Sequence, residues 1–368
     1  SFIEVVFFIS LISILSKRKK PLPKLYVYWC SCFLLTLFVS FVVNLDIKNH
    51  YLSNALISGL ISYVKIPIIM AAIYKTMQDA DDLKTMLFSV SLAAPIMLLQ
   101  NVYVTLAKNA GNVAIGKSQM TGVIPGPGPT ASYLLMLFPI LISYSFLTKS
   151  RFYKSIILAL SLTSIIFILL SYTRSAYIGL IFTVIMLCTG LYRKKRLLLS
   201  FISIGLLMVI MFFILNIAEI NLKNKFTATL YGDIDDTINL GVRMTYWEHA
   251  LSLIKRHPIF GIGPNMWGLT TAVGGTNVHN GYINIILDIG VIGLIIFLIP
   301  IIKSFFSFFN NIKLSKTYRN IAICIMSGVL GYLITQFFSC SIMNVRVMVL
   351  LWTSLTIQNI LPKLNKLR

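Results

Sequence analysis

Long apolar runs separated by short polar segments fill nearly the whole chain. Many of these runs approach the roughly 20 residues that a helix needs to cross a bilayer. They are apolar throughout instead of alternating with polar positions, which favours transmembrane helices over membrane strands. The pattern predicts an all-α, polytopic membrane protein with about eleven spans. The expected spans cover approximately residues 2–15, 25–43, 52–74, 83–106, 130–147, 155–172, 175–192, 197–217, 282–302, 321–338 and 347–361.

The largest break in this pattern runs from residue 218 to residue 280. It divides the chain into a first group of spans within 1–217, a large loop at 218–280 and a last group of spans within 281–368. A second polar segment, rich in glycine and proline, occupies residues 108–129.

Composition supports this class. The chain is 57% hydrophobic and only 12% charged, whereas a soluble domain carries about 25% charged residues. The formal net charge of +21 would suggest nucleic acid for a soluble protein. Here Lys and Arg lie mainly in short loops, as the positive-inside rule predicts, so we expect no nucleic-acid partner. The five cysteines show neither a disulfide framework nor metal-site spacing.

Loop charge also predicts the orientation. The basic runs at 17–20 (KRKK) and 193–196 (RKKR), together with Lys303 and the basic residues within 313–319, fall on one side when the spans alternate. We therefore place that side in the cytoplasm and the 218–280 loop outside. Ser1 then lies outside, and the chain begins without Met. We expect one earlier span, which makes about twelve spans with both ends cytoplasmic.

An amphipathic helix is expected within the large loop. Met244, Trp247, Leu251 and Ile254 recur at helical spacing over 242–256, and Pro258 ends the pattern. The segment that follows, 259–264, is apolar yet rich in turn residues. This combination suits a segment that enters a cleft or lies on the headgroup layer.

His279 is the candidate catalytic base. The Gly274-Gly275 pair permits a turn that delivers His279 to the mouth of the span beginning near residue 282. A neutral imidazole there can remove a proton from an attacking hydroxyl. The alternative interpretation is an interfacial histidine that only caps a helix.

Arginines on the outer face oppose the usual charge bias. Arg174 joins two spans there, Arg243 begins the amphipathic helix, and Arg346 precedes the last span. A guanidinium fork matches phosphate oxygens, so the three side chains could converge on a lipid pyrophosphate. Snorkelling of Arg174 into headgroups is the alternative.

Two further features were weighed as sites. Asp233, Asp235 and Asp236 resemble an acidic clip for Mg²⁺ or Mn²⁺, but such clusters are usually just solvated, and we expect no metal and no other cofactor. Lys65 lies inside an apolar run, which makes it a functional candidate without an assigned role.

Several motifs, in this order on one expected face, resemble the O-antigen ligase and O-antigen polymerase superfamily. The resemblance covers residues 116 to 293. The motifs are 121–129 (TGVIPGPGP), 173–176 (TRSA), Arg243 with Trp247, 257–264 (HPIFGIGP), 279–282 (HNGY) and 288–293 (DIGVIG). Asp288 stands where the family often has Glu.

The resemblance implies a helical, GT-C-like glycosyltransferase at the outer face of the bacterial plasma membrane. Its donor would be an undecaprenyl-pyrophosphate-linked glycan, and its acceptor another carrier-linked unit or lipid A-core, without a metal. His279 would be the base, and Arg174 and Arg243 would act on the pyrophosphate. Asn280, Tyr282, Trp267 and Arg346 are the further candidates for substrate binding.

We expect a polymerase of O-antigen or capsule repeat units, with a chain-length regulator protein as a possible partner. The alternative is a ligase that moves finished glycan to lipid A-core or to a protein. A transporter or flippase of lipid-linked sugars is a third hypothesis. It is disfavoured because the expected spans are nearly free of charge and the sequence shows no internal repeat.

Overall fold

The computed structural model describes residues 21–45, 50–109, 127–171, 173–191, 234–270 and 278–366. The expected spans at 2–15 and 197–217, the Gly274-Gly275 turn, Asp233 and most of the 108–129 segment lie outside the described residues. Every regular element within these ranges is a helix. The helices are α2 (Lys24–Asn44), α3 (His50–Thr76), α4 (Ala80–Asn109), α5 (Pro127–Ser145), α6 (Arg151–Leu170), α7 (Arg174–Leu191), α10 (Ile234–Arg256), α11 (Trp267–Thr270), α12 (Gly281–Asn311), α13 (Lys316–Thr335) and α14 (Val345–Lys366).

Eight helices in the described part of the chain are long and apolar enough to cross a membrane. They are α2, α3, α4, α6, α7, α12, α13 and α14. The prediction of an all-α, polytopic membrane protein is therefore confirmed. Helix α5 occupies the expected span near 130–147 but is not among the eight. Its first turn is rich in proline and glycine, and most of its later side chains are buried by neighbouring helices, so its surface need not match lipid.

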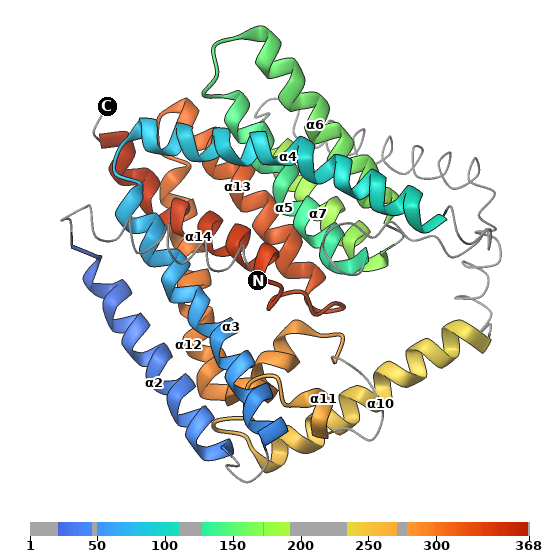
Figure 1. Cartoon of the computed structure of the whole chain (residues 1–368). Helices are drawn as coiled ribbons and strands as arrows, with labels where there is room; N and C mark the ends of the chain where they lie inside the picture. The colour runs from blue at the N-terminus through green and yellow to red at the C-terminus, as the bar shows by residue number, and fades with distance from the viewer. Residues whose placement is uncertain are drawn as a thin grey trace.

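Helices α5, α6, α7 and α13 form one tightly packed group, which Figure 1 shows in green and orange-red. Small residues permit the closest approach. A Cβ placed on Gly331 of α13 would lie 1.9 Å from the Thr183 hydroxyl of α7. Such contacts replace the hydrophobic driving force that is absent between helices in lipid.

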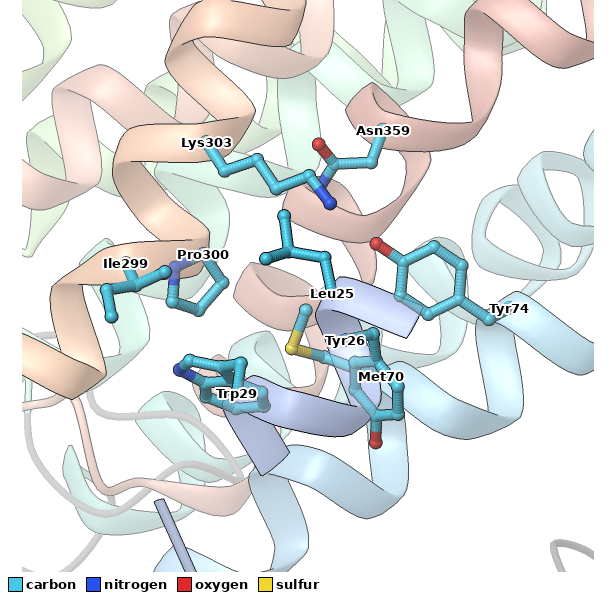
Figure 2. Close-up of a pocket in the computed structure, with 9 residues that line it drawn as sticks. All are labelled: Leu25, Tyr26, Trp29, Met70, Tyr74, Ile299, Pro300, Lys303 and Asn359. Atoms are coloured by element: carbon cyan, nitrogen blue, oxygen red, sulfur yellow. The ribbon is translucent and has the colours of Figure 1, made fainter. Parts of the chain in front are cut away.

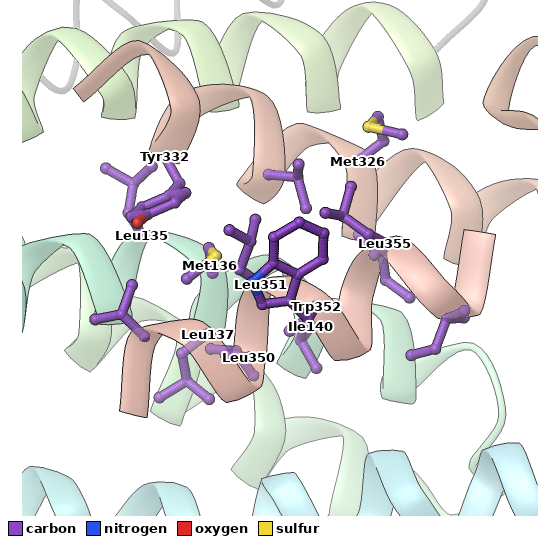
Figure 3. Close-up of a cluster of buried hydrophobic side chains, with 14 of the residues drawn as sticks. Leu135, Met136, Leu137, Ile140, Met326, Tyr332, Leu350, Leu351, Trp352 and Leu355 are labelled. Carbon is purple, nitrogen blue, oxygen red and sulfur yellow. The ribbon is translucent and has the colours of Figure 1, made fainter. Parts of the chain in front are cut away.

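A second group contains α2, α3, α10, α11 and α12 (Figure 1). Helix α14 contacts α3 and α12 in this group and α5 and α13 in the other, so it joins the two. Trp352 of α14 is fully buried at this junction, where its ring contacts Phe297 of α12 (5.2 Å between centroids) and Trp29 of α2 (6.4 Å). Side chains of α5 and α13 belong to the same buried cluster (Figure 3).

Helix termini fall at two ends of the assembly. The N–H of Gly281, at the start of α12, donates to the Gln336 carbonyl just after α13 (2.8 Å). Gly128 of α5 approaches Ser339 in the turn that follows α13. The starts of α5, α7, α12 and α14 and the ends of α2, α6 and α13 thus share one end, which we call the His279 end. The other end, where α12 stops, is the Lys303 end.

Candidate active site

His279 lies immediately before α12 and against one face of α10. Its backbone is left-handed (φ 55°), which is uncommon for a residue other than glycine. The imidazole lies parallel to the Tyr246 ring, with the centroids 6.3 Å apart and an interplanar angle of 6°. The Trp247 indole N–H donates to the Val278 carbonyl (3.0 Å). Two adjacent aromatic residues of α10 therefore hold the segment that carries His279.

The electrostatics favour a neutral imidazole. Burial, and secondly the charge of Arg243, lower the pKa of His279 below its usual value. Protonation would place a second positive charge beside a guanidinium in a half-desolvated position. His279 is thus kept in the form that can accept a proton, and Arg243 lies close enough to act on it.

The expected helix at 242–256 is confirmed, and it begins earlier, at Ile234. The expected buried face was wrong in part. Met244 and Leu251 are about half exposed (53% and 50%), whereas Tyr246 and Ala250 are buried. The helix turns its aromatic Tyr246 towards Trp267 of α11 and towards His279 instead.

Asn280 begins α12 as its N-cap. Its side-chain oxygen accepts from the N–H groups of Tyr282 and Ile283 (3.0 and 3.1 Å), and its amide nitrogen donates to the Phe337 carbonyl (3.1 Å). Tyr282 donates its hydroxyl to the Leu333 carbonyl (2.8 Å). Both contacts tie the start of α12 to the end of α13, and so they hold His279 in place.

Helix α12 is broken at Gly290, whose backbone (φ 72°, ψ −178°) is not helical. The loop after α10 fills the break. The Ile262 N–H donates to the Leu287 carbonyl (2.7 Å), and the Val291 N–H donates to the Pro258 carbonyl (2.9 Å). Backbone groups freed by the break are therefore satisfied by protein, as a membrane interior requires. The turn-rich 259–264 segment therefore lies against the break in α12.

Asp288 fastens the same loop. Its buried carboxylate accepts from the Tyr63 hydroxyl (2.8 Å), the Asn284 amide (3.0 Å) and the Asn265 N–H (3.2 Å). Asp288 and the break at Gly290 both lie within the apolar run that was expected to form a span, and both bind the loop that leads from α10.

Trp267 follows this loop in α11. Its side chain is 2% exposed and packs on the Tyr246 ring (6.1 Å between centroids) and the His249 ring (5.6 Å). Trp267 therefore packs against Tyr246, which in turn stacks on His279.

Arg174 and Arg346 lie at the His279 end, at the starts of α7 and α14, and both are exposed. The positive charge of Arg346 interacts electrostatically with the Tyr133 phenol of α5.

Asp235 and Asp236 lie in the first turn of α10. Among the described residues, no group of three or more His, Cys, Asp or Glu side chains could hold a metal ion. Lys65 is buried within α3.

Residues 157–298 match the family model described as O-antigen ligase. The matched segment contains Arg174, Arg243 and His279 in the order expected from the motifs. This match supports the resemblance to the O-antigen ligase and polymerase superfamily that the motifs indicated.

The matched family indicates a glycosyl-transferring enzyme of ligase or polymerase type, and the apolar helices indicate a multi-pass membrane protein. Its family implies lipid-linked glycan and acceptor substrates in the membrane. A comparison with curated proteins finds no match.

Two residues that organise this O-antigen ligase-type site were missed from the sequence. Tyr246 lies one turn after Arg243 on α10, and that spacing was the available signal. Gln336 is fully buried and bonds Thr335, Ser341 and the Gly281 N–H. Nothing in the local sequence pattern distinguishes it from other polar residues at a helix end.

Proposed function

We propose that this enzyme joins carrier-linked oligosaccharide units into O-antigen or capsule polymer at the outer face of the bacterial plasma membrane. The observation that supports the proposal most directly is the neutral imidazole of His279 beside the Arg243 guanidinium. The first group suits a base, and the second suits an anionic leaving group.

In the proposed reaction, His279 takes the proton from an acceptor hydroxyl as its oxygen attacks C1 of the donor sugar. The bond between C1 and the pyrophosphate oxygen breaks, and undecaprenyl pyrophosphate leaves with the bonding electrons. Arg243 and Arg174, with Arg346 at the rim, stabilise the charge that develops on that oxygen. In this scheme the guanidinium groups supply the positive charge, and no metal ion takes part.

The remaining candidate residues take supporting roles in this proposal. Asn280 and Tyr282 hold the start of α12 against the end of α13, and Trp267 packs against the Tyr246 ring. Of these three, Asn280 and Tyr282 have partly exposed side chains that can contact substrate, whereas Trp267 is buried.

Transfer of finished glycan to lipid A-core is the second candidate function. The matched family model is described as O-antigen ligase, which favours it. Both reactions use the same base and the same leaving group, and they differ only in the acceptor.

Deletion of the gene distinguishes the two functions on a gel of surface glycan. A polymerase deletion leaves one repeat unit on the lipid core. A ligase deletion leaves core without repeats, together with carrier-linked polymer. Complementation with His279→Ala or Arg174→Ala should fail at normal protein levels in the membrane, because a positioned base alone contributes about 10²–10⁴-fold. Normal glycan ladders in both complemented strains would refute the catalytic assignment.

A further inference from the structure

A hollow at the Lys303 end lies between α2, α3, α12 and α14, far along the helices from His279. It is a shallow, half-open hollow, and the space of about 270 Å³ between its walls includes space that is open to the surroundings. Aromatic and aliphatic side chains make up most of its wall, and Lys303 is its cation (Figure 2). The lining residues are Leu25, Tyr26, Trp29, Met70, Tyr74, Ile299, Pro300, Lys303 and Asn359.

The position of Lys303 differs from the sequence expectation. The apolar pattern placed it in a loop after a span ending near residue 302, but α12 continues to Asn311. Lys303 is therefore a half-buried residue inside a helix, and its side chain reaches the hollow. Among the described residues, its ammonium has no ion-pair or hydrogen-bond partner.

Neighbouring polar groups are already engaged. The Tyr26 hydroxyl donates to the Pro67 carbonyl (2.5 Å). The Asn359 amide donates to Ser304 Oγ and to the Leu355 carbonyl, and its oxygen accepts from Ser307 (2.7 Å). These bonds leave the Lys303 ammonium as the polar group of the hollow that is available to an anion.

The surface beyond the hollow suits acyl chains. From Ile299 on α12, exposed Ile295 and Ile292 continue the same helical face. From Leu25 on α2, exposed Tyr28 and Leu35 continue along the neighbouring helix. Ten residues of helix rise about 15 Å, which is half of the roughly 30 Å hydrocarbon core of a bilayer. The exposed apolar strip thus has the depth of one leaflet.

Charge at this end also complements an anionic lipid. The described helix ends and turns here carry many basic residues and three acidic ones, Asp79, Asp81 and Asp82. The basic residues are Lys24, Lys75, Lys84, Lys149, Arg151, Lys154, Lys303, Lys313, Lys316, Arg319, Lys363 and Lys366. Such clusters attract anionic headgroups, and Lys303 alone among them lines the aromatic hollow.

We infer that the hollow at Lys303 binds the phosphate of an anionic phospholipid whose acyl chains lie along α2 and α12. The ammonium pairs with the phosphate, and Tyr74 and Trp29 flank the headgroup at the depth where aromatic belts lie. The site is separate from the glycosyl-transfer chemistry, so a His279→Ala protein should retain it.

Native mass spectrometry of delipidated protein titrated with phosphatidylglycerol tests the site. Lys303→Gln should weaken binding of the first lipid by about tenfold, the loss expected for one charge-assisted contact. Lys303→Arg keeps the charge and should bind like the wild type. Lys316→Gln removes an exposed charge at the same end and should leave that binding unchanged.

Two competition arms identify the ligand. Phosphatidylcholine should bind more weakly than phosphatidylglycerol, because its headgroup carries no net charge. Glycerol phosphate should displace the lipid only at far higher concentration, because it lacks acyl chains. The inference would be overturned if Lys303→Gln bound phosphatidylglycerol like the wild type, or if Lys316→Gln lost as much affinity as Lys303→Gln. It would also be overturned if phosphatidylcholine or glycerol phosphate bound as tightly as phosphatidylglycerol. Unchanged thermal unfolding without lipid shows that each variant is folded.

Discussion

His279, the proposed base, has a well-fixed position and a lowered affinity for protons. The fixed position comes from the Tyr246 stack and from the Asn280 cap beside it. The low proton affinity comes from burial and from Arg243. A left-handed backbone at a non-glycine residue costs about 1–2 kcal/mol, and such strain concentrates at functional sites.

The charge of Arg243 should be visible in the pH dependence of transfer. A base works only when neutral, so activity falls as pH drops through the pKa of His279. Arg243→Gln removes a charge that lowers this pKa, so the acid limb should move to higher pH. Maximal activity should also fall by about 10²-fold, if Arg243 stabilises the leaving group.

Arg243→Lys is the matched control for that experiment. It keeps the charge but loses the bidentate fork, so activity should fall while the acid limb stays in place. The measurement is the pH profile of glycan transfer in vitro from a lipid-linked donor. An unmoved limb in Arg243→Gln would mean that His279 is not the titrating base.

At this scale the sequence identifies His279 and Arg243 as candidates, because few polar residues interrupt the apolar pattern, and their catalytic roles remain predictions. The sequence was insufficient for Tyr246, since one aromatic residue on an amphipathic helix resembles any other. The predicted substrate roles of Trp267, Asn280, Tyr282 and Arg346 remain predictions. The structure adds that Trp267 is buried and that Asn280 caps α12.

At the scale of elements, the active-site geometry depends on how α10 is attached to α12. Arg243 and Tyr246 belong to α10, whereas His279 precedes α12. The loop 257–266 leaves α10 and enters the break at Gly290, so the break fixes one end of α10 against α12. Asp288 and Ser40 reinforce the attachment, the latter by donating to the Phe260 carbonyl (2.7 Å).

Gly290→Ala should therefore disrupt both stability and activity. A Cβ at this position would lie 2.0 Å from the Ile259 carbonyl oxygen, and the φ of 72° disfavours any side chain. We expect a loss of about 3 kcal/mol or more in unfolding free energy. Thermal unfolding in detergent measures it.

Gly128→Ala provides the comparison, because its Cβ would make an ordinary contact of 3.5 Å with Ser339. That variant should unfold at the wild-type temperature. If Gly290→Ala is equally stable, then the loop does not occupy the break.

Hydrophobic periodicity located nearly every helix in the described residues but not this break. Gly290 lies within a continuous apolar run, and one glycine in such a run does not distinguish a kink from a straight helix. The docking partner, 258–262, is distant in sequence, and only the tertiary structure brings it there. The same limit explains Lys303, because a pattern of apolar residues cannot show that α12 continues past a charge.

At the scale of the whole molecule, the two ends differ in chemistry. The His279 end holds the proposed base, the arginines and the amphipathic helix. The Lys303 end holds the dense basic clusters and the lipid hollow. Loop charge predicts that the Lys303 end faces the cytoplasm, which would put His279 on the side where carrier-linked glycans are polymerised or ligated.

Single-cysteine labelling tests this orientation. The five native cysteines are free, so they must first be replaced by serine. Met244→Cys on exposed α10 and Lys316→Cys at the start of α13 then report the two ends. A membrane-impermeant maleimide applied to intact spheroplasts should label the first variant and spare the second, and permeabilised cells should label both. The reverse pattern would place His279 in the cytoplasm, and the proposed outer-face reaction would then be untenable, although the lipid hollow would remain testable in detergent.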